Sequence, residues 1–251
     1  MQKQFLTLAL LAAASAAQAE DSFSLGVGFD YSTGKYGGDT STNILYVPVT
    51  GKYIADKLTL KLTVPYIRVS SAGNVVSGMG RTGVTAASSK TTTQSGLGDV
   101  IATAAYVIHD SGKLVLDLAG NVKFGTASAQ KSLGTGENDY SAQVDGFYAM
   151  SNTSLFTTLG YKVMGQPAGI IVNNIVYGSA GVSQKLDDKY TAGVVLDAAQ
   201  SATELSPGIR ELSVFVSNKI RPDLKLQANL MKGFSDASAD YGVGATLTGT
   251  F

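Results

Sequence analysis

The sequence predicts an all-β protein, built as a single transmembrane, antiparallel, up-and-down β-barrel of about 12 strands. Three observations support this prediction: apolar residues recur with a period of two, the segments that carry this period are about ten to thirteen residues long, and short turns alternate with long polar loops. A tilted strand needs about 9–11 residues to cross a membrane. Because short turns face the periplasm in such barrels, an even strand count predicts that both the N- and C-termini are periplasmic.

The composition excludes several other classes of protein. Nineteen Lys and Arg residues balance 19 Asp and Glu residues, so the chain lacks the basic surface that binding to nucleic acid requires. Charged residues make up 15% of the chain, below the roughly 25% of soluble domains. With no Cys and one His, neither a disulfide framework nor a thiolate metal site can form. We therefore expect no cofactor, no metal and no cofactor-binding residue.

The N-terminal segment, MQKQFLTLALLAAASAAQAE, has the pattern of a secretory signal peptide. A lysine precedes an apolar run over 5–14, and a small-x-small cleavage site follows at 17–19. The apolar run is shorter than the roughly 20 residues of a membrane-spanning helix. We expect residues 1–19 to be a signal peptide and residues 20–251 to form one barrel domain, which crosses the bacterial outer membrane with strands.

The first segment after this leader, FSLGVGFDY, shows the strand pattern clearly. Its Phe, Leu, Val, Phe and Tyr residues fall on one face, and its Ser, Gly, Gly and Asp residues fall on the other. Eleven further segments repeat the alternation, although glycine and alanine blur the two faces of 174–185. The expected strands are 23–31, 43–54, 58–69, 96–108, 113–124, 139–151, 153–165, 174–185, 189–199, 209–219, 224–233 and 239–251.

The connections alternate in length, and aromatic residues cluster near both ends of the strands. Amphipathic rings at both strand ends are typical of the two headgroup levels of a membrane. The tight turns are 55–57, 109–112, 152, 186–188 and 220–223. The long loops are 32–42, 70–95, 125–138, 166–173, 200–208 and 234–238. The longest loop, 70–95, is a candidate to fold inward and plug the barrel; the alternative is a solvated loop.

Charged residues lie opposite the apolar faces and are therefore expected to face the interior. A charge that faces lipid at the middle of the membrane costs about 2–4 kcal/mol. Six of these residues are acidic and six are basic, which indicates ion pairs across the barrel, with Lys61 and Asp99 as one candidate pair; the alternative role is a pore lining. The lumen-facing candidates are Asp30, Lys52, Lys61, Asp99, Asp117, Lys123, Asp145, Lys162, Asp197, Glu211, Lys219 and Lys225.

Two prolines, Pro48 and Pro65, lie inside expected strands. Proline removes one donor from the hydrogen-bond ladder, so each is a candidate for a strand kink. Because Pro65 lies near a long loop, a kink there could open the barrel wall sideways to the membrane.

Residues 95–100, SGLGDV, raise the question of a phosphate-binding loop. Such loops need G-x-x-x-x-G-K-[ST], or a third glycine in G-x-G-x-x-G, and neither pattern is met. We expect these glycines to lead a long loop into a strand, with Asp99 toward the interior.

The GLGD stretch, the upstream Pro65-Tyr66-Ile67-Arg68, the signal peptide and the final Phe251 together resemble one family. This is the family of outer-membrane transporters of the phenol-degradation meta-pathway type, similar in turn to outer-membrane channels for aromatic and other hydrophobic compounds. The resemblance implies a passive channel for small, hydrophobic or aromatic molecules, and it supplies no binding-site residues. The alternative from another class is a closed structural or adhesive barrel without transport.

An enzyme is not expected. His109, Asp110 and Ser111 are adjacent in one tight turn, and adjacent turn residues do not converge on one reacting atom. The acidic segment 137–139 either binds calcium or caps a solvated turn, and we favour the cap. The expected partners are outer-membrane lipid, a small organic substrate, and the barrel-assembly machinery, which would read the alternating C-terminal strand that ends at Phe251.

Overall fold

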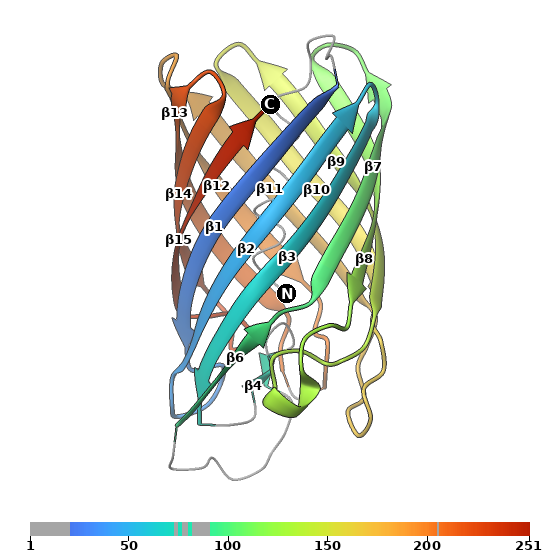
Figure 1. Ribbon diagram of the computed structural model, residues 1–251, viewed down its shortest axis with the longest axis vertical. Coiled ribbons are helices and arrows are strands. Elements are labelled where there is room, and N and C mark those ends of the chain that lie inside the picture. The colour runs from blue at the N-terminus through green and yellow to red at the C-terminus, as the bar shows by residue number, and fades with distance from the viewer. Residues whose placement is uncertain (1–20, 73–74, 77–79, 82–90, 205) are drawn as a thin grey trace.

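The computed structural model describes residues 21–72, 75–76, 80–81, 91–204 and 206–251 (Figure 1). The expected signal peptide, residues 1–19, lies outside the described residues, and so does much of loop 70–95. The described chain is all-β apart from one short 3-10 turn, η2 (Ala129–Lys131). Among these residues, no helix is long and apolar enough to cross a membrane. The strands are β1 (Ser22–Gly34), β2 (Thr42–Ala55), β3 (Leu58–Ser71), β4 (Val75–Val76), β5 (Gly80–Arg81), β6 (Thr92–Leu97), β7 (Val100–Asp110), β8 (Leu114–Phe124), β9 (Asp139–Met150), β10 (Thr153–Val163), β11 (Ile175–Lys185), β12 (Tyr190–Ala199), β13 (Ile209–Arg221), β14 (Leu224–Gly233) and β15 (Tyr241–Thr250).

The main sheet closes into an antiparallel barrel. The long strands pair in sequence order around the ring, β3 pairs with both β6 and β7, and β1 pairs with β15 to close the ring. The sheet has 13 strands, but β6 and β7 lie end to end along β3, so twelve strand positions surround the interior. The prediction of an up-and-down barrel of about 12 strands is confirmed.

Short turns and long loops gather at opposite ends of this barrel (Figure 1). We call these the short-turn end, at the top of Figure 1, and the long-loop end. The start of β1 and the end of β15 both lie at the short-turn end, where Phe23 and Phe251 exchange backbone hydrogen bonds of 3.3 and 2.8 Å. Both barrel termini therefore lie on one side of the membrane, and the periplasm stays the predicted side.

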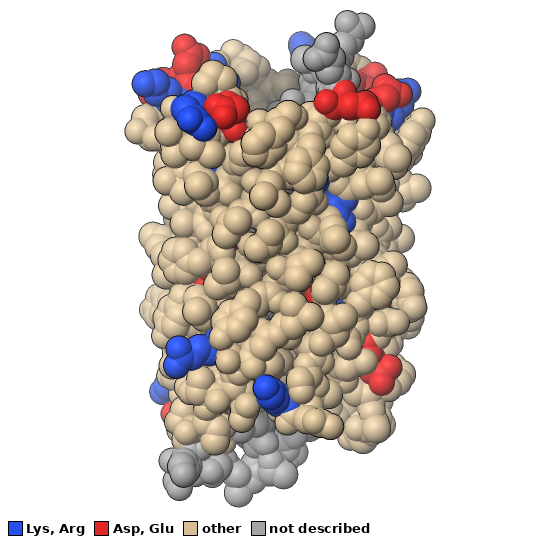
Figure 2. All heavy atoms as spheres, in the orientation of Figure 1, with Lys and Arg blue, Asp and Glu red and all other residues tan. Residues whose placement is uncertain are grey.

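The outer surface of the barrel is apolar. Large exposed side chains such as Leu62, 50% exposed, alternate with less exposed residues along most of the strands that the sequence predicted. On the face shown in Figure 2, most charged side chains gather toward the two ends, with a nearly uncharged band between them. The exposed aromatic residues near the strand ends are Tyr31, Tyr53, Tyr66, Tyr106, Phe124, Tyr140, Tyr148, Tyr161, Tyr190, Tyr241 and Phe251. This surface suits lipid, because an apolar band flanked by aromatic residues matches the membrane core and its two headgroup layers.

One predicted boundary is wrong. Loop 70–95 was expected to be loop throughout, but β3 continues to Ser71, β6 begins at Thr92, and β4 pairs with β5 inside the segment. Ser70 and Thr93 are register partners, and their hydroxyls hydrogen-bond at 3.0 Å. These strand extensions are polar on both faces, so the hydrophobic period cannot reveal them.

Candidate functional site: the barrel interior and its inward-folded loop

The two strand prolines lie opposite each other on β2 and β3. Each interrupts the hydrogen-bond ladder to the next strand on its other side, β1 for Pro48 and β7 for Pro65. Pro48 and Pro65 are register partners in the otherwise continuous β2–β3 pairing. Beyond Pro48, the β1–β2 pairing lapses between Val27 and Asp30. Beyond Pro65, β3 pairs with β7 as far as Thr63 and with β6 from Tyr66 onward. Because proline has no N–H to donate, each interruption falls where a ladder bond would be missing.

The break beyond Pro65 is filled by the GLGD stretch. Gly98 donates its N–H to the Pro65 carbonyl at 2.8 Å. A side chain at Gly98 would lie 2.9 Å from Cγ of Pro65, so only glycine passes the proline ring at ordinary contact distance. Gly98 thus lets the chain pass Pro65 between β6 and β7. This agrees with the expectation that the glycines lead a long loop into a strand. Whether the barrel opens sideways at this break stays a prediction.

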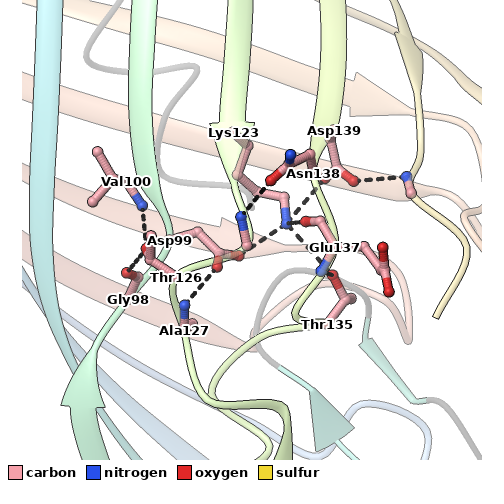
Figure 3. Close-up of polar contacts among 12 residues, drawn as sticks. Gly98, Asp99, Val100, Lys123, Thr126, Ala127, Thr135, Glu137, Asn138 and Asp139 are labelled. Atoms are coloured by element: carbon pink, nitrogen blue, oxygen red, sulfur yellow. Dashed lines mark hydrogen bonds and ion pairs between the residues drawn. The ribbon is translucent and has the colours of Figure 1, made fainter. Parts of the chain in front are cut away.

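Asp99 lies in this break and holds the start of loop 125–138 (Figure 3). Its Oδ1 accepts from the Ala127 N–H at 3.0 Å, and its Oδ2 accepts from Nζ of Lys123 at 2.9 Å. The Thr126 hydroxyl donates to the Gly98 carbonyl at 2.8 Å and accepts from the Val100 N–H at 2.9 Å. The loop is therefore tied to the wall at the point where the strand is broken.

Lys123 connects this point to the other end of the same loop. Its ammonium donates to the Glu137 carbonyl at 2.9 Å and lies 3.4 Å from Oδ2 of Asp139, while Oδ1 of Asp139 accepts from the Gly165 N–H at 3.0 Å. The side chains of Lys123, Asp99 and Asp139 are 11%, 14% and 3% exposed. We call Asp99, Lys123 and Asp139 the latch, because they fix both ends of loop 125–138.

The pairing of Asp99 with Lys61 was wrong. Along β7, Lys123 opposes Ile101, which is two residues from Asp99. Lys61 opposes Thr103, which is four residues from Asp99. The segment 137–139 fits its role as a cap, since Asn138 accepts from the Gly125 N–H at 2.9 Å and Asp139 belongs to the latch. Over the described part of the chain, no group of three or more His, Cys, Asp or Glu residues is arranged to hold a metal ion.

Loop 125–138 packs into the interior of the barrel. Ala127 and Leu133 are 3% exposed and form a buried cluster with Ile67 and Val69 of β3. The β2 side chains Ile44 and Tyr46 pack against this cluster from the same inward face. No inward fold was expected for this loop. For loop 70–95, inward folding was one of two alternatives, and this loop lies mostly outside the described ranges.

Four interior carboxylates lie in one row around part of the barrel wall. Asp117, Asp145, Asp197 and Glu211 belong to one continuous row of register partners across β8 to β13, completed by Thr158 and Ser179. Asp145 accepts hydrogen bonds from the Thr158 hydroxyl at 2.5 Å and from the Gln143 amide. Asp197 and Glu211 are 5% and 6% exposed. We call this row the carboxylate row.

Three interior lysines lie on β2, β3 and β14, whereas Lys123 and Lys162 lie on β8 and β10. Lys52 and Lys61 are register partners on β2 and β3, and they are 8% and 9% exposed. Lys225, on β14, pairs with Lys219 of β13 near the short-turn end, and both are more exposed. We call Lys52, Lys61 and Lys225 the lysine group.

The remaining interior candidates lie toward the long-loop end. Nζ of Lys162 lies 5.5 Å from the centre of the Tyr177 ring. Asp30 opposes Gly244 and Tyr46 on the inward face. Among the described interior residues, the ion pairs join Lys123 to Asp99 and to Asp139. General pairing of the other interior charges stays a prediction.

An aromatic patch on the interior wall was missed by sequence reasoning. Phe156, Val195 and Phe215 form a buried cluster, and Phe147 packs against it. A side chain at Gly181 would collide with the Phe156 ring, and one at Gly193 would collide with the Phe215 ring, so both rings lie across glycines of adjacent strands. The signal was present in the sequence as phenylalanines on the polar face of their strands, opposite glycines.

The remaining candidates lie at the short-turn end. His109 is exposed, next to an irregularity in the β7–β8 register. Asp110 accepts from the Gly112 N–H at 2.7 Å, and the Ser111 hydroxyl accepts from the Leu114 N–H at 3.2 Å, so both side chains support the turn. Phe251 is 79% exposed, and its ring lies 6.4 Å from that of Phe23.

Comparison with known proteins gives a family and a fold. The family described as "Putative MetA-pathway of phenol degradation" matches residues 39–251. Curated protein sequences gave no match.

Solved structures of outer-membrane barrels resemble the whole chain. The KdgM porin in complex with disordered oligogalacturonate is 11% identical, with a TM-score of 0.55 over 92% of this chain and 99% of the porin. The NanC porin is 10% identical, with a TM-score of 0.56 over 89% of this chain and 97% of the porin. The translocator domain of the autotransporter NalP from Neisseria meningitidis is 11% identical, with a TM-score of 0.52 over 99% of this chain and 94% of that domain. At these identities the likeness concerns the fold alone.

Proposed function

The chain belongs to the MetA-pathway phenol-degradation family, and we propose that it works in the outer membrane as a passive channel for small hydrophobic or aromatic molecules. Membership of this family and the porin-like barrel support a channel or transporter of the bacterial outer membrane. The aromatic substrate class is the part of the proposal that depends on the interior wall.

The aromatic patch is the observation that carries the proposal. Phe147, Phe156 and Phe215 lie on the inward face of β9, β10 and β13, while the outward face of these strands carries the lipid-facing residues. The rings of Phe156 and Phe215 lie across Gly181 and Gly193 of the adjacent strands and, with Val195, form an apolar patch on the inward face of the wall. Aromatic solutes stack on such faces with about 0.5–1.5 kcal/mol beyond simple burial. The adjacent carboxylate row supplies acceptors for a solute hydroxyl or amine.

The rival function is a closed barrel without transport. The latched loop 125–138 favours it, because this loop fills part of the interior at the long-loop end. A channel requires either a path beside this loop or release of the loop from the latch.

Uptake of an uncharged aromatic dye by intact bacterial cells separates the two functions. Cells that express the protein and cells that carry the empty vector receive N-phenyl-1-naphthylamine, whose fluorescence rises when it enters the membrane interior. The proposal predicts faster uptake with the wild-type protein. Phe215→Leu, which keeps an apolar side chain but removes the ring, should slow uptake by about threefold.

The matched control is Phe29→Leu, because Phe29 lies on the outward face at 44% exposure. Heat-dependent migration in gels shows whether each variant is folded in the outer membrane. Uptake no faster than in vector cells, with the barrel folded, would support the closed structural or adhesive barrel.

A further inference from the structure

We propose that the lysine group, Lys52, Lys61 and Lys225, is a binding site for a small anion inside the barrel, either an inorganic anion or the carboxylate end of an organic one. This inference rests on the proposed channel function for its biological meaning, and it extends that function from uncharged aromatic molecules to aromatic acids.

The strand order brings the three lysines onto one stretch of wall. Strands β14, β15, β1, β2 and β3 are consecutive around the ring. On β2 and β3, Lys52 and Lys61 are direct register partners. Lys225 of β14 opposes Thr248 of β15, and Thr248 opposes Gly26 of β1. Two residues before Gly26, Ser24 opposes Lys52 of β2, so Lys225 and Lys52 lie at nearly the same level of the wall. Inward residues alternate along each strand, so all three side chains start from the inner face.

The three ammonium groups have no partner among the described residues. None of them makes a hydrogen bond or ion pair there; the ion pairs of the described chain involve Lys123, Lys185 and Arg221. Lys52 and Lys61 are nevertheless more than nine-tenths buried. Burying a charge is costly unless a counter-charge accompanies it.

The three charges also act on one another. The positive charge of Lys225 acts on Lys52, and that of Lys52 acts on Lys61. The negative charge of Asp145 on β9 acts on Lys61 more strongly than Lys52 does, but Asp145 already accepts hydrogen bonds from Thr158 and Gln143. A group of repelling ammoniums on one wall attracts an anion more strongly than a single lysine does.

Neutral hydroxyl groups complete the surroundings. Thr50 and Thr63 hydrogen-bond to each other at 3.0 Å, two register positions from the Lys52–Lys61 pair and on the same inner face. Thr103, which opposes Lys61, donates to the Asn121 amide oxygen at 2.7 Å. These groups add polarity without adding negative charge, which suits an anion between the lysines.

Lys123 shows what a structural interior lysine looks like in the same barrel. It has two carboxylate partners and a backbone carbonyl, and its loop is fixed by them. The lysine group has none of these contacts, so stabilising the fold does not explain its burial.

Calorimetric titration of the refolded barrel in detergent tests the site without requiring conduction. The probes are benzoate and its uncharged relative benzyl alcohol, each at constant ionic strength, with chloride as competitor. We expect benzoate to bind through its carboxylate and benzyl alcohol to bind at least tenfold more weakly. Lys52→Met and Lys61→Met should each weaken benzoate binding by about fivefold.

The control variant is Lys185→Met, which removes an exposed lysine already paired with Asp188 at 2.8 Å. Circular dichroism and heat-dependent gel migration verify folding. If chloride competes with benzoate at equal concentration, the site takes inorganic and organic anions alike; if only benzoate binds, it takes organic carboxylates. Absence of binding by both anions, or equal benzoate binding by the wild type and both lysine variants, would overturn the proposal. The dye-uptake experiment with an uncharged probe can succeed or fail independently of this result.

Discussion

Two lysines of the interior, Lys61 and Lys123, carry the same charge in different surroundings. Lys123 joins Asp99 and Asp139 and holds both ends of an inward-folded loop. Lys61 faces Lys52 and lacks a described partner. The sequence placed both residues on the inner face but could not distinguish them, because partner choice depends on register and on a loop that carries no hydrophobic period. The contacts of the latch therefore depend on tertiary structure and cannot be predicted from the sequence of any one strand.

Replacing Lys123 should release the loop. Lys123→Met leaves Asp99 and Asp139 without a cationic partner, and breaking a buried ion pair in this way costs about 3–5 kcal/mol. The barrel ladders do not involve this side chain, so we expect the barrel to stay folded while loop 125–138 detaches. Limited trypsin digestion measures this, because exposed Lys131 lies within the loop; cleavage there should become much faster than in the wild type.

The control for this variant is again Lys185→Met. Lys185 hydrogen-bonds the exposed Asp188 carboxyl and lowers its pKa, but it holds no loop inside the barrel. Equal cleavage at Lys131 in the wild type and in Lys123→Met would show that the latch does not restrain the loop.

At the scale of elements, the period of two located every barrel strand, and it failed where strands are polar on both faces. Strands β8 to β14 lie within a few residues of their expected bounds, because alternating lipid-facing and interior residues are what the membrane imposes. The extension of β3 and residues 92–95 of β6 escaped detection because Thr, Gln and Ser occupy both faces of this part of β6. Pro65 and Gly98 were recognised separately, but their contact across the broken strand position requires the register.

The broken strand position should be visible in hydrogen exchange. Strand β7 pairs with both β3 and β8, whereas β6 pairs with β3 alone. Backbone amides with few protecting neighbours open more readily. In the detergent-solubilised barrel, we expect amides of 92–97 to exchange markedly faster than those of 100–108 under the same conditions. Equal protection of the two segments would mean that β6 has a second pairing partner in solution.

At the scale of the whole molecule, the barrel has an apolar outer belt, an interior lined with acidic and basic residues, and loop 125–138 packed inward at the long-loop end. Fold class and membrane location follow from the sequence because lipid constrains every strand in the same way. The interior site does not follow from it, since interior residues are chosen by their neighbours on adjacent strands. The phenylalanines over Gly181 and Gly193, the carboxylate row and the lysine group all depend on register.

Single-channel conductance in a planar bilayer tests the channel most directly. Three refolded proteins are compared: the wild type, Lys123→Met, and a form in which residues 127–135 are removed. Gly125 lies against the backbone of Gly136 and Glu137, so the cut ends can be joined without disturbing β8 or β9. We predict steady conductance for the wild type that increases in Lys123→Met and increases further in the shortened form. Folded barrels that carry no current in all three proteins would contradict a channel governed by loop 125–138.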